Sequence, residues 1–231
     1  MTPNREDYLK LIFELGGDEV KVNNKQIVSG LDVSAASVSE MISKLVKEDL
    51  VEHSPYQGVQ LTEKGLKKAS TLIRKHRIWE VFLVEHLNYT WNDVHEEAEV
   101  LEHVTSQTLV NRLADYLNHP EFCPHGGVIP EDNQPIHEEK RQTLTDYPVG
   151  TKVRIARVLD EKELLDYLVS IDLNIQEEYT IKEIAAYEGP ITIYNENKEL
   201  SVSFKAANTI FVEPLIRAVS YTHLTLPTIC S

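Results

Sequence analysis

The chain contains 231 residues, of which 42% are hydrophobic, and it carries a formal net charge of −14 at pH 7. This composition excludes a wholly disordered chain, and the length allows two or three small units with separate cores. No run approaches the roughly eighteen apolar residues of a transmembrane helix, and the polar start MTPNREDYLK does not resemble a signal peptide. We therefore expect a cytoplasmic protein without a membrane partner.

The acidic charge is unevenly distributed along the chain. Residues 1–75 contain eleven Lys and Arg and eleven Asp and Glu, so the remaining residues, with 12 basic and 26 acidic side chains, carry the whole excess. Because Lys and Arg must neutralise the phosphates of bound DNA, the net charge alone would argue against DNA binding. The neutral N-terminal third removes that objection, and the acidic remainder is suited to a cation.

The first 70 residues predict a winged helix-turn-helix. Their apolar periodicity and turn residues indicate helices over residues 4–15, 25–31 and 34–49 and short strands over 51–53 and 59–61. Asn24 and Ser34 are the expected N-caps of the second and third helices, because their side-chain oxygens can accept a bond from a free backbone N–H. Three helices followed by a hairpin, with a tight turn between the last two helices, is the element order of this DNA-binding fold.

The start of the helix at residue 34 presents small and hydroxyl-bearing side chains. Such side chains let the backbone approach the major groove closely, and their hydroxyls can bond phosphates or base edges. Flanking lysines can neutralise phosphates. The candidate DNA-binding residues are Lys25, Ser34, Ala35, Ala36, Ser37, Ser39 and Lys44. An ordinary helical hairpin inside a core is the alternative interpretation.

Helical periodicity continues into the middle of the chain and then gives way to a strand pattern. Three helices are expected over residues 62–87, 91–104 and 106–117. A polar, proline-bearing linker is expected over 131–146. From residue 147 the pattern alternates as in strands, apart from a short helix over 162–171, and the spacing of its turns predicts a small β-barrel. Residues 218–231 fit none of these patterns and are interpreted as a non-native tail.

The segment HEEAEVLEH, residues 95–103, places ligand-type side chains along one side of a helix. At about 100° per residue, four of these side chains fall within roughly 100° of one another. The four are His95, Glu99, Glu102 and His103. The apolar Val100, Leu101 and Val104 lie on the opposite side, and we expect that side to be buried. Glu97 lies towards the apolar side and is not a candidate ligand.

Two further pairs carry the same types of side chain. His76 and Glu80 have i, i+4 spacing on the preceding helix, and Cys123 and His125 lie two residues apart in a Gly/Pro-rich loop. A protease of the HExxH type is excluded, because Glu99 replaces the second histidine. A solvated acidic face, in which His–Glu pairs merely stabilise helices, is the alternative. We favour a divalent metal, because clustered carboxylates repel one another without a cation, and oxygen and nitrogen ligands suit Mn²⁺ or Fe²⁺ better than Zn²⁺.

Together these residues resemble the DtxR/MntR family of metal-dependent transcriptional repressors, in its streptococcal, manganese-responsive, three-domain form. The resemblance extends over about residues 2–217, and its motifs are HRIWE at 76–80, HEEAEVLEH at 95–103 and CPHG at 123–126. It implies a multidomain α+β fold. The implied domains are a winged helix-turn-helix over residues 1–70, a helical dimerisation and metal-binding domain over 71–130, and a C-terminal SH3-like β-barrel of the FeoA type over 147–217.

The resemblance also implies two metal sites. The first would use Asp7, His76, Glu99, Glu102 and His103. The second would use Glu80, Cys123, His125 and, from the barrel, Asp160, with His95 close to it. Iron-sensing members have Met and Cys where this chain has Asp7 and Glu99, and replacing sulfur by carboxylate favours Mn²⁺ over Fe²⁺. Zn²⁺ or Cd²⁺ would also bind in vitro.

The implied function is a homodimer that binds double-stranded operator DNA and represses manganese-uptake genes when Mn²⁺ is plentiful. It would not be an enzyme. A metal that links Asp7 to the dimerisation helices would fix the spacing of the two DNA-reading heads. Two alternatives belong to other functional classes. One is a metallohydrolase whose His/Glu cluster activates water, and the other is a winged-helix regulator that responds to a small organic ligand.

Overall fold

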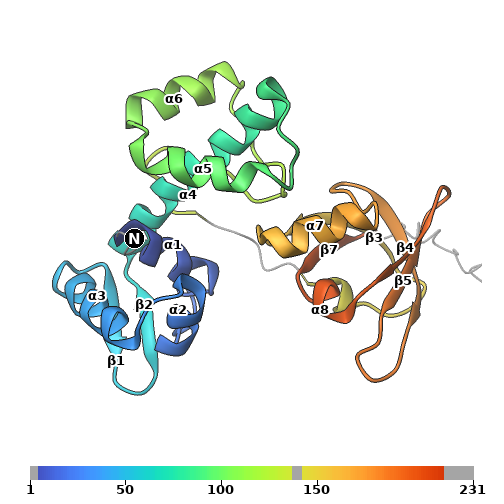
Figure 1. Cartoon of the computed structure of the whole chain (residues 1–231), viewed down its shortest axis with the longest axis horizontal. Helices are drawn as coiled ribbons and strands as arrows, with labels where there is room; N and C mark the ends of the chain where they lie inside the picture. The colour runs from blue at the N-terminus through green and yellow to red at the C-terminus, as the bar shows by residue number, and fades with distance from the viewer. Residues whose placement is uncertain (1–4, 137–141, 216–231) are drawn as a thin grey trace, which may run out of the picture. The chain divides into compact units, whose positions relative to one another are not determined.

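The computed structural model describes residues 5–136 and 142–215, so the expected tail at 218–231 and part of the expected linker lie outside the described residues. The chain divides into two compact units (Figure 1). Among the described residues, the first unit contains 5–136 and 157–175, and the second contains 142–156 and 176–215. Among the described residues, no helix is long and apolar enough to cross a membrane.

The first unit begins with the winged helix-turn-helix that the sequence predicts. Its elements are α1 (Arg5–Glu14), α2 (Asn24–Leu31), α3 (Ala35–Lys47), β1 (Val51–Ser54) and β2 (Gly58–Leu61). Ser34 caps α3 as expected, and its side chain accepts a bond from the backbone N–H of Ser37. The predicted cap of α2 was wrong by one residue. Asn23 is the N-cap and forms a capping box with Gln26, because a glutamine three residues after the cap can return a bond to the cap backbone.

The helix α4 (Glu63–Leu87) is the spine of the first unit, and α5 (Val94–Val104) and α6 (Gln107–Tyr116) follow it (Figure 1). It packs against α1 near its start and against α5 further along. Thr62 caps it by accepting a bond from the backbone N–H of Gly65. At Gly65 a Cβ would lie 1.9 Å from the carbonyl oxygen of Leu50, so glycine is needed where the spine meets the hairpin.

The helix α5 does not bury the face that the sequence predicted. Of the three apolar residues expected inside, Leu101 is half-buried and packs against Val94 and Ala98, but Val100 and Val104 are 66% and 78% exposed, and Glu102 is buried instead. The burial prediction failed because it assigned the apolar side of α5 to the interior of this chain. The interior side instead carries a carboxylate, and an apolar strip remains exposed.

The second unit contains a five-stranded antiparallel sheet in the order β6-β5-β4-β3-β7. Its strands are β3 (Lys152–Val158), β4 (Glu178–Ile184), β5 (Ile191–Tyr194), β6 (Glu199–Val202) and β7 (Ile210–Pro214). The SH3-like architecture is confirmed, but the described strands form an open sheet with edges at β6 and β7 and do not close as a barrel. A short helix, α8 (Phe204–Ala207), lies between β6 and β7 and interrupts the expected strand pattern, and Ser203 caps it. The helix α7 (Lys162–Ser170) belongs to the first unit.

Candidate metal centre

Three groups of ligand-type atoms lie in the first unit, and within each group the atoms are no more than 4.8 Å apart. The Asp7 cluster contains Asp7, Glu102 and His103. The Asp160 cluster contains His76, Glu80, His95 and Asp160. The Cys123 cluster contains Glu80, Cys123 and His125. Glu80 therefore belongs to two clusters.

The Asp7 cluster joins α1 to α5. Nε2 of His103 lies 3.0 Å from Oδ1 of Asp7 and 3.5 Å from Oε1 of Glu102. On the other side of the ring, Nδ1 of His103 lies 3.0 Å from Oε2 of Glu6. A carboxylate bound at one ring nitrogen orients a histidine so that the other nitrogen faces a metal. Glu6 therefore positions His103 for ligation through Nε2.

The Asp160 cluster brings α4, α5 and the segment after β3 together. Nε2 of His76 lies 3.1 Å from Oε1 of Glu80 and 3.2 Å from Oδ2 of Asp160. Nδ1 of His95 lies 2.5 Å from the same Asp160 oxygen. The helical spacing places His76 and Glu80 on one side of α4, one turn apart, so both belong to the same cluster without distortion of the helix.

The Cys123 cluster lies on the other side of the Glu80 carboxylate. Nδ1 of His125 is 3.1 Å from Oε1 of Glu80, and Nε2 of His125 donates to the backbone carbonyl of Trp91 at 2.6 Å. This bond leaves Nδ1 facing the cluster. Cys123 and His125 are both buried, as is Glu80.

The charges of the clustered groups balance one another. Burial lowers the pKa of His95, but Asp160 and Glu99 together outweigh burial and raise it to about 9. Burial likewise opposes protonation of His125, yet the Glu80 carboxylate raises its pKa to about 12. Burial and Asp160 raise the pKa of Glu80, but His76 and His125 outweigh them and lower it to about 2. In the absence of a metal, positively charged imidazolium groups thus neutralise the negative charge of the clustered carboxylates.

Two carboxylate oxygens show that these groups fit a divalent ion. Oε2 of Glu80 and Oδ1 of Asp160 are buried and have no hydrogen-bond partner among the described residues. A buried acceptor without a donor is costly. A bound cation would satisfy both oxygens, and the nearby imidazole and thiol groups would complete its coordination.

The clusters differ in two places from the ligand sets expected from the sequence. His76 was expected with Asp7, but its Nε2 faces the Asp160 cluster. Glu99, also expected with Asp7, is exposed and contacts Nε2 of His95 at 3.1 Å. The other expected ligands all lie in the three clusters. How a bound metal divides these ligands stays a prediction.

Sequence reasoning missed Lys10, whose ammonium contacts members of two clusters. Its Nζ lies 3.0 and 3.3 Å from the two carboxylate oxygens of Glu102 and 3.1 Å from Nδ1 of His76. Burial lowers the pKa of Lys10, but the nearby carboxylates, Glu102 foremost and then Glu14 and Glu99, together raise it above its usual value. The available signal was its position three residues after Asp7, which places both on the same side of α1.

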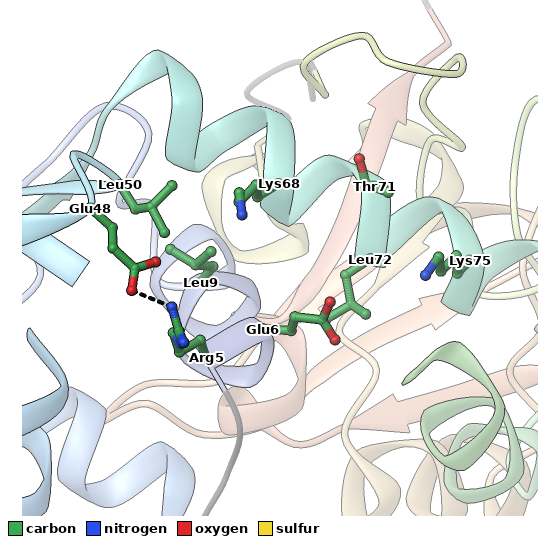
Figure 2. A pocket seen from close by; sticks show the side chains of 9 residues that line it. All are labelled: Arg5, Glu6, Leu9, Glu48, Leu50, Lys68, Thr71, Leu72 and Lys75. Atoms are coloured by element: carbon green, nitrogen blue, oxygen red, sulfur yellow. Dashed lines mark hydrogen bonds and ion pairs between the residues drawn. The ribbon is translucent and has the colours of Figure 1, made fainter. Parts of the chain in front are cut away.

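A separate cavity of about 460 Å³ lies between the start of α1 and α4 (Figure 2). Figure 2 shows Arg5 paired with Glu48 on one side and Lys68 and Lys75 along α4 on the other. Glu6 also lines this cavity. Its walls therefore carry both signs of charge, and they do not define one class of ligand.

The candidate DNA-binding residues lie at the surface of the first unit. Ser34, Ala35, Ala36 and Ser39 are exposed, as are Lys25 and Lys44, and Ser37 is half-buried. Lys44 is paired with Glu40 at 2.7 Å. Because Ala35 and Ala36 have short side chains at the N-terminus of α3, the helix can approach another macromolecule closely there.

Comparison with known proteins agrees with this arrangement. Family models match for the iron dependent repressor N-terminal DNA binding domain over residues 1–59 and for the iron dependent repressor metal binding and dimerisation domain over 62–131. A FeoA domain matches over 142–214. The iron-dependent repressor IdeR of Mycobacterium bovis is 36% identical over 157 residues, which cover 65% of this chain and 68% of that protein. The chain belongs to the iron-dependent repressor family.

Solved members of this family have the same fold. The manganese regulator SloR is 46% identical, with a TM-score of 0.81 over 93% of this chain and 100% of that chain. ScaR with bound Zn²⁺ is 39% identical, with a TM-score of 0.82 over 91% of this chain and 99% of that chain. As a member of the iron-dependent repressor family, the protein is a metal-dependent transcriptional repressor and not an enzyme. The metallohydrolase and the organic-ligand regulator are not favoured.

Proposed function

We propose that the protein is a Mn²⁺-activated repressor that binds operator DNA as a homodimer in the cytoplasm and controls manganese-uptake genes. The supporting observation is the Asp7 cluster, in which a carboxylate of the DNA-binding half meets Glu102 and His103 of the helical half. A cation held by all three would fasten α1 to α5. DNA affinity would then depend on metal concentration.

The donor atoms support manganese as the activating metal. The Asp7 cluster offers carboxylate oxygens and an imidazole nitrogen, which suit Mn²⁺. The name of the solved relative SloR also describes a manganese regulator. The Cys123 cluster adds a thiol, so it would accept softer ions such as Zn²⁺ or Cd²⁺ in vitro. Iron stays an alternative, as the name of IdeR indicates for that relative.

Activation would act through the position of α1. When bound, the ion supplies a divalent charge that ligands from α1 and α5 share. Asp7 then holds the first turn of α1, and the rest of that helix packs on α2 and on the hairpin strand β2. Restricting α1 therefore restricts the orientation of α3. A ligand that favours one such arrangement shifts the population towards it.

The DNA-reading element would be α3. Ser34, Ala35 and Ala36 would enter the major groove with the helix N-terminus, whose partial positive charge favours phosphate. Ser37 and Ser39 would contact phosphates or base edges, and Lys25 and Lys44 would neutralise phosphates. Because no arginine lies in this set, sequence preference would rest on close fit, on DNA shape and on the spacing of two half-sites.

The exposed strip on α5 supports homodimer formation. Val100 and Val104 lie one turn apart and are largely exposed. An apolar strip on the outside of a helix is typical of an interface. Two copies joined here would present two α3 helices to the two halves of a palindromic operator.

A selection experiment tests the proposed function. A pool of random DNA duplexes is incubated with the full-length protein in Mn²⁺ and, in parallel, in EDTA. We expect enrichment of inverted repeats in Mn²⁺ alone. Enrichment of the same sequences in EDTA would contradict metal activation, and an absence of enrichment in both would contradict operator binding.

A further inference from the structure

The ammonium of Lys10 lies among carboxylate oxygens and an imidazole nitrogen, which are the kinds of atom that bind metals. Both carboxylate oxygens of Glu102 and Nδ1 of His76 lie between 3.0 and 3.3 Å from its Nζ. These distances exceed the roughly 2.0–2.3 Å of metal–ligand bonds, and those to Glu102 are the distances of a hydrogen-bonded ion pair, beside which Nδ1 of His76 binds the same carboxylate. Lys10 is only 9% exposed, so water replaces little of this interaction.

The position of Lys10 brings it into competition with a divalent ion. Glu102 is fully buried, and it belongs to the Asp7 cluster. A metal bound by Asp7, Glu102 and His103 would lie beside the ammonium. Two cations on one buried carboxylate repel strongly, because the interior screens charge poorly. A bound metal therefore weakens the ion pair between the Lys10 ammonium and Glu102, and that ion pair weakens metal binding.

The structure offers the ammonium another place. A cavity of about 180 Å³ borders Lys10 and is lined also by Glu14 and His76. Glu14 is four residues after Lys10 on α1, the spacing at which side chains of a helix pair. Glu14 has an exposed side chain, yet the surrounding protein raises the pKa of its carboxyl and Lys10 opposes that rise, so an ammonium that moves towards Glu14 would stabilise its charged form.

We propose that Lys10 is a tethered counter-cation of the Asp7 cluster, which a divalent ion displaces from Glu102 and whose ammonium then pairs with Glu14. The inference rests on the proposed function and assigns to Lys10 the setting of the metal concentration at which the protein responds. Without metal, the ion pair between the singly charged Lys10 ammonium and Glu102 links α1 to α5. With metal, Asp7 and His103 join the same link.

Mn²⁺ binding without DNA tests the exchange directly. Free Mn²⁺ is followed by its electron paramagnetic resonance signal during titration of the full-length protein and of Lys10→Met. We expect the Kd of Lys10→Met to fall by about tenfold, because charged hydrogen bonds of this kind contribute on that order. Lys68→Met is the matched control, since it removes the same charge at an exposed site on α4 and should leave the Kd unchanged.

The destination of the ammonium is tested by a double-mutant cycle. Glu14→Gln should weaken Mn²⁺ binding several-fold in the parent protein and have little effect in the Lys10→Met background. Equal effects in the two backgrounds would overturn the transfer to Glu14. Should Lys10→Met fail to fold by circular dichroism, Lys10→Gln serves in its place.

The outcomes separate this inference from the proposed function. If the parent protein binds Mn²⁺ and the Lys10 variants bind it equally or more weakly, the exchange is wrong while metal activation stands. If the parent protein binds no Mn²⁺, the proposed function fails, and the exchange fails with it.

Discussion

Nδ1 of His76 lies 2.5 Å from Oε2 of Glu102, and Nε2 of the same ring lies 3.1 Å from Oε1 of Glu80. One buried imidazole therefore joins the Asp7 cluster to the Asp160 cluster. A metal bound in either cluster changes the charge beside the His76 ring. It therefore also changes which hydrogen bonds the two ring nitrogens can donate or accept. Occupation of one cluster is thus expected to alter metal affinity at the other, and thermodynamic linkage makes this effect reciprocal.

Asp7→Ala should weaken Mn²⁺ binding strongly. The substitution removes the only ligand of the Asp7 cluster that comes from the DNA-binding half. Loss even of a group that orients a ligand costs about 10–100-fold in metal affinity, and loss of a ligand should cost at least as much. Mn²⁺ titration measures the effect. Glu97→Ala is the control, because Glu97 is an exposed carboxylate on α5 outside the three clusters. Equal weakening by both variants would refute the proposed cluster.

Metal affinity should fall as the pH is lowered from about 9 to 6. In the metal-free protein the pKa of His95 is raised to about 9, since Asp160 and Glu99 together outweigh the effect of burial. Ligation needs the neutral imidazole, so binding must release a proton over this range. Calorimetry in buffers of different ionisation enthalpy counts the protons released. His95→Asn should release fewer, and an unchanged count would exclude His95 from the proton exchange.

The double substitution Val100→Asp and Val104→Asp should separate the dimer into monomers. Both side chains are largely exposed on α5, and burying two carboxylates in an apolar interface without partners is costly. Sedimentation velocity measures the oligomeric state. Val149→Asp alters a comparably exposed valine, at 56%, outside α5 and should leave the dimer intact. A double variant that stays dimeric would place the interface elsewhere.

Ala36→Glu should abolish operator binding without changing Mn²⁺ affinity. The exposed side chain lies in the first turn of α3, where a carboxylate would be repelled by phosphate. Gel shift with a selected operator measures DNA binding, and Mn²⁺ titration measures metal affinity. Ala186→Glu makes the same exposed change in the second unit and should retain both. Retained DNA binding by Ala36→Glu would remove α3 from the DNA interface.

Features specified by neighbouring residues could be predicted from the sequence. Ser34 caps its helix as expected, because its bonding partner, the backbone N–H of Ser37, is three residues away. The turn after β5 is held by equally local bonds. Asn195 accepts bonds from the backbone N–H groups of Asn197 and Lys198.

Features that depend on distant parts of the chain could not be predicted. Helical periodicity grouped the side chains of α5 by side. Which side faces the interior depends on packing against α4, and the sequence of α5 alone does not show it. The two ring nitrogens of His76 face both clusters, Nδ1 towards Glu102 and Nε2 towards Asp160, and only packing sets this direction of its ring. Lys10 was missed for the same reason, because its partner Glu102 is 92 residues away.

The most direct test of the account measures the affinity of the full-length protein for a fluorescent operator duplex by anisotropy, with Mn²⁺ and with EDTA. The duplex is taken from the selection described above. If a metal held by Asp7, Glu102 and His103 fixes α1, Mn²⁺ should raise the DNA affinity by about tenfold or more, within the usual range of coupling between two sites. Asp7→Asn should lose this gain and keep the weak affinity seen in EDTA. An equal DNA affinity in Mn²⁺ and in EDTA for the parent protein would contradict the account.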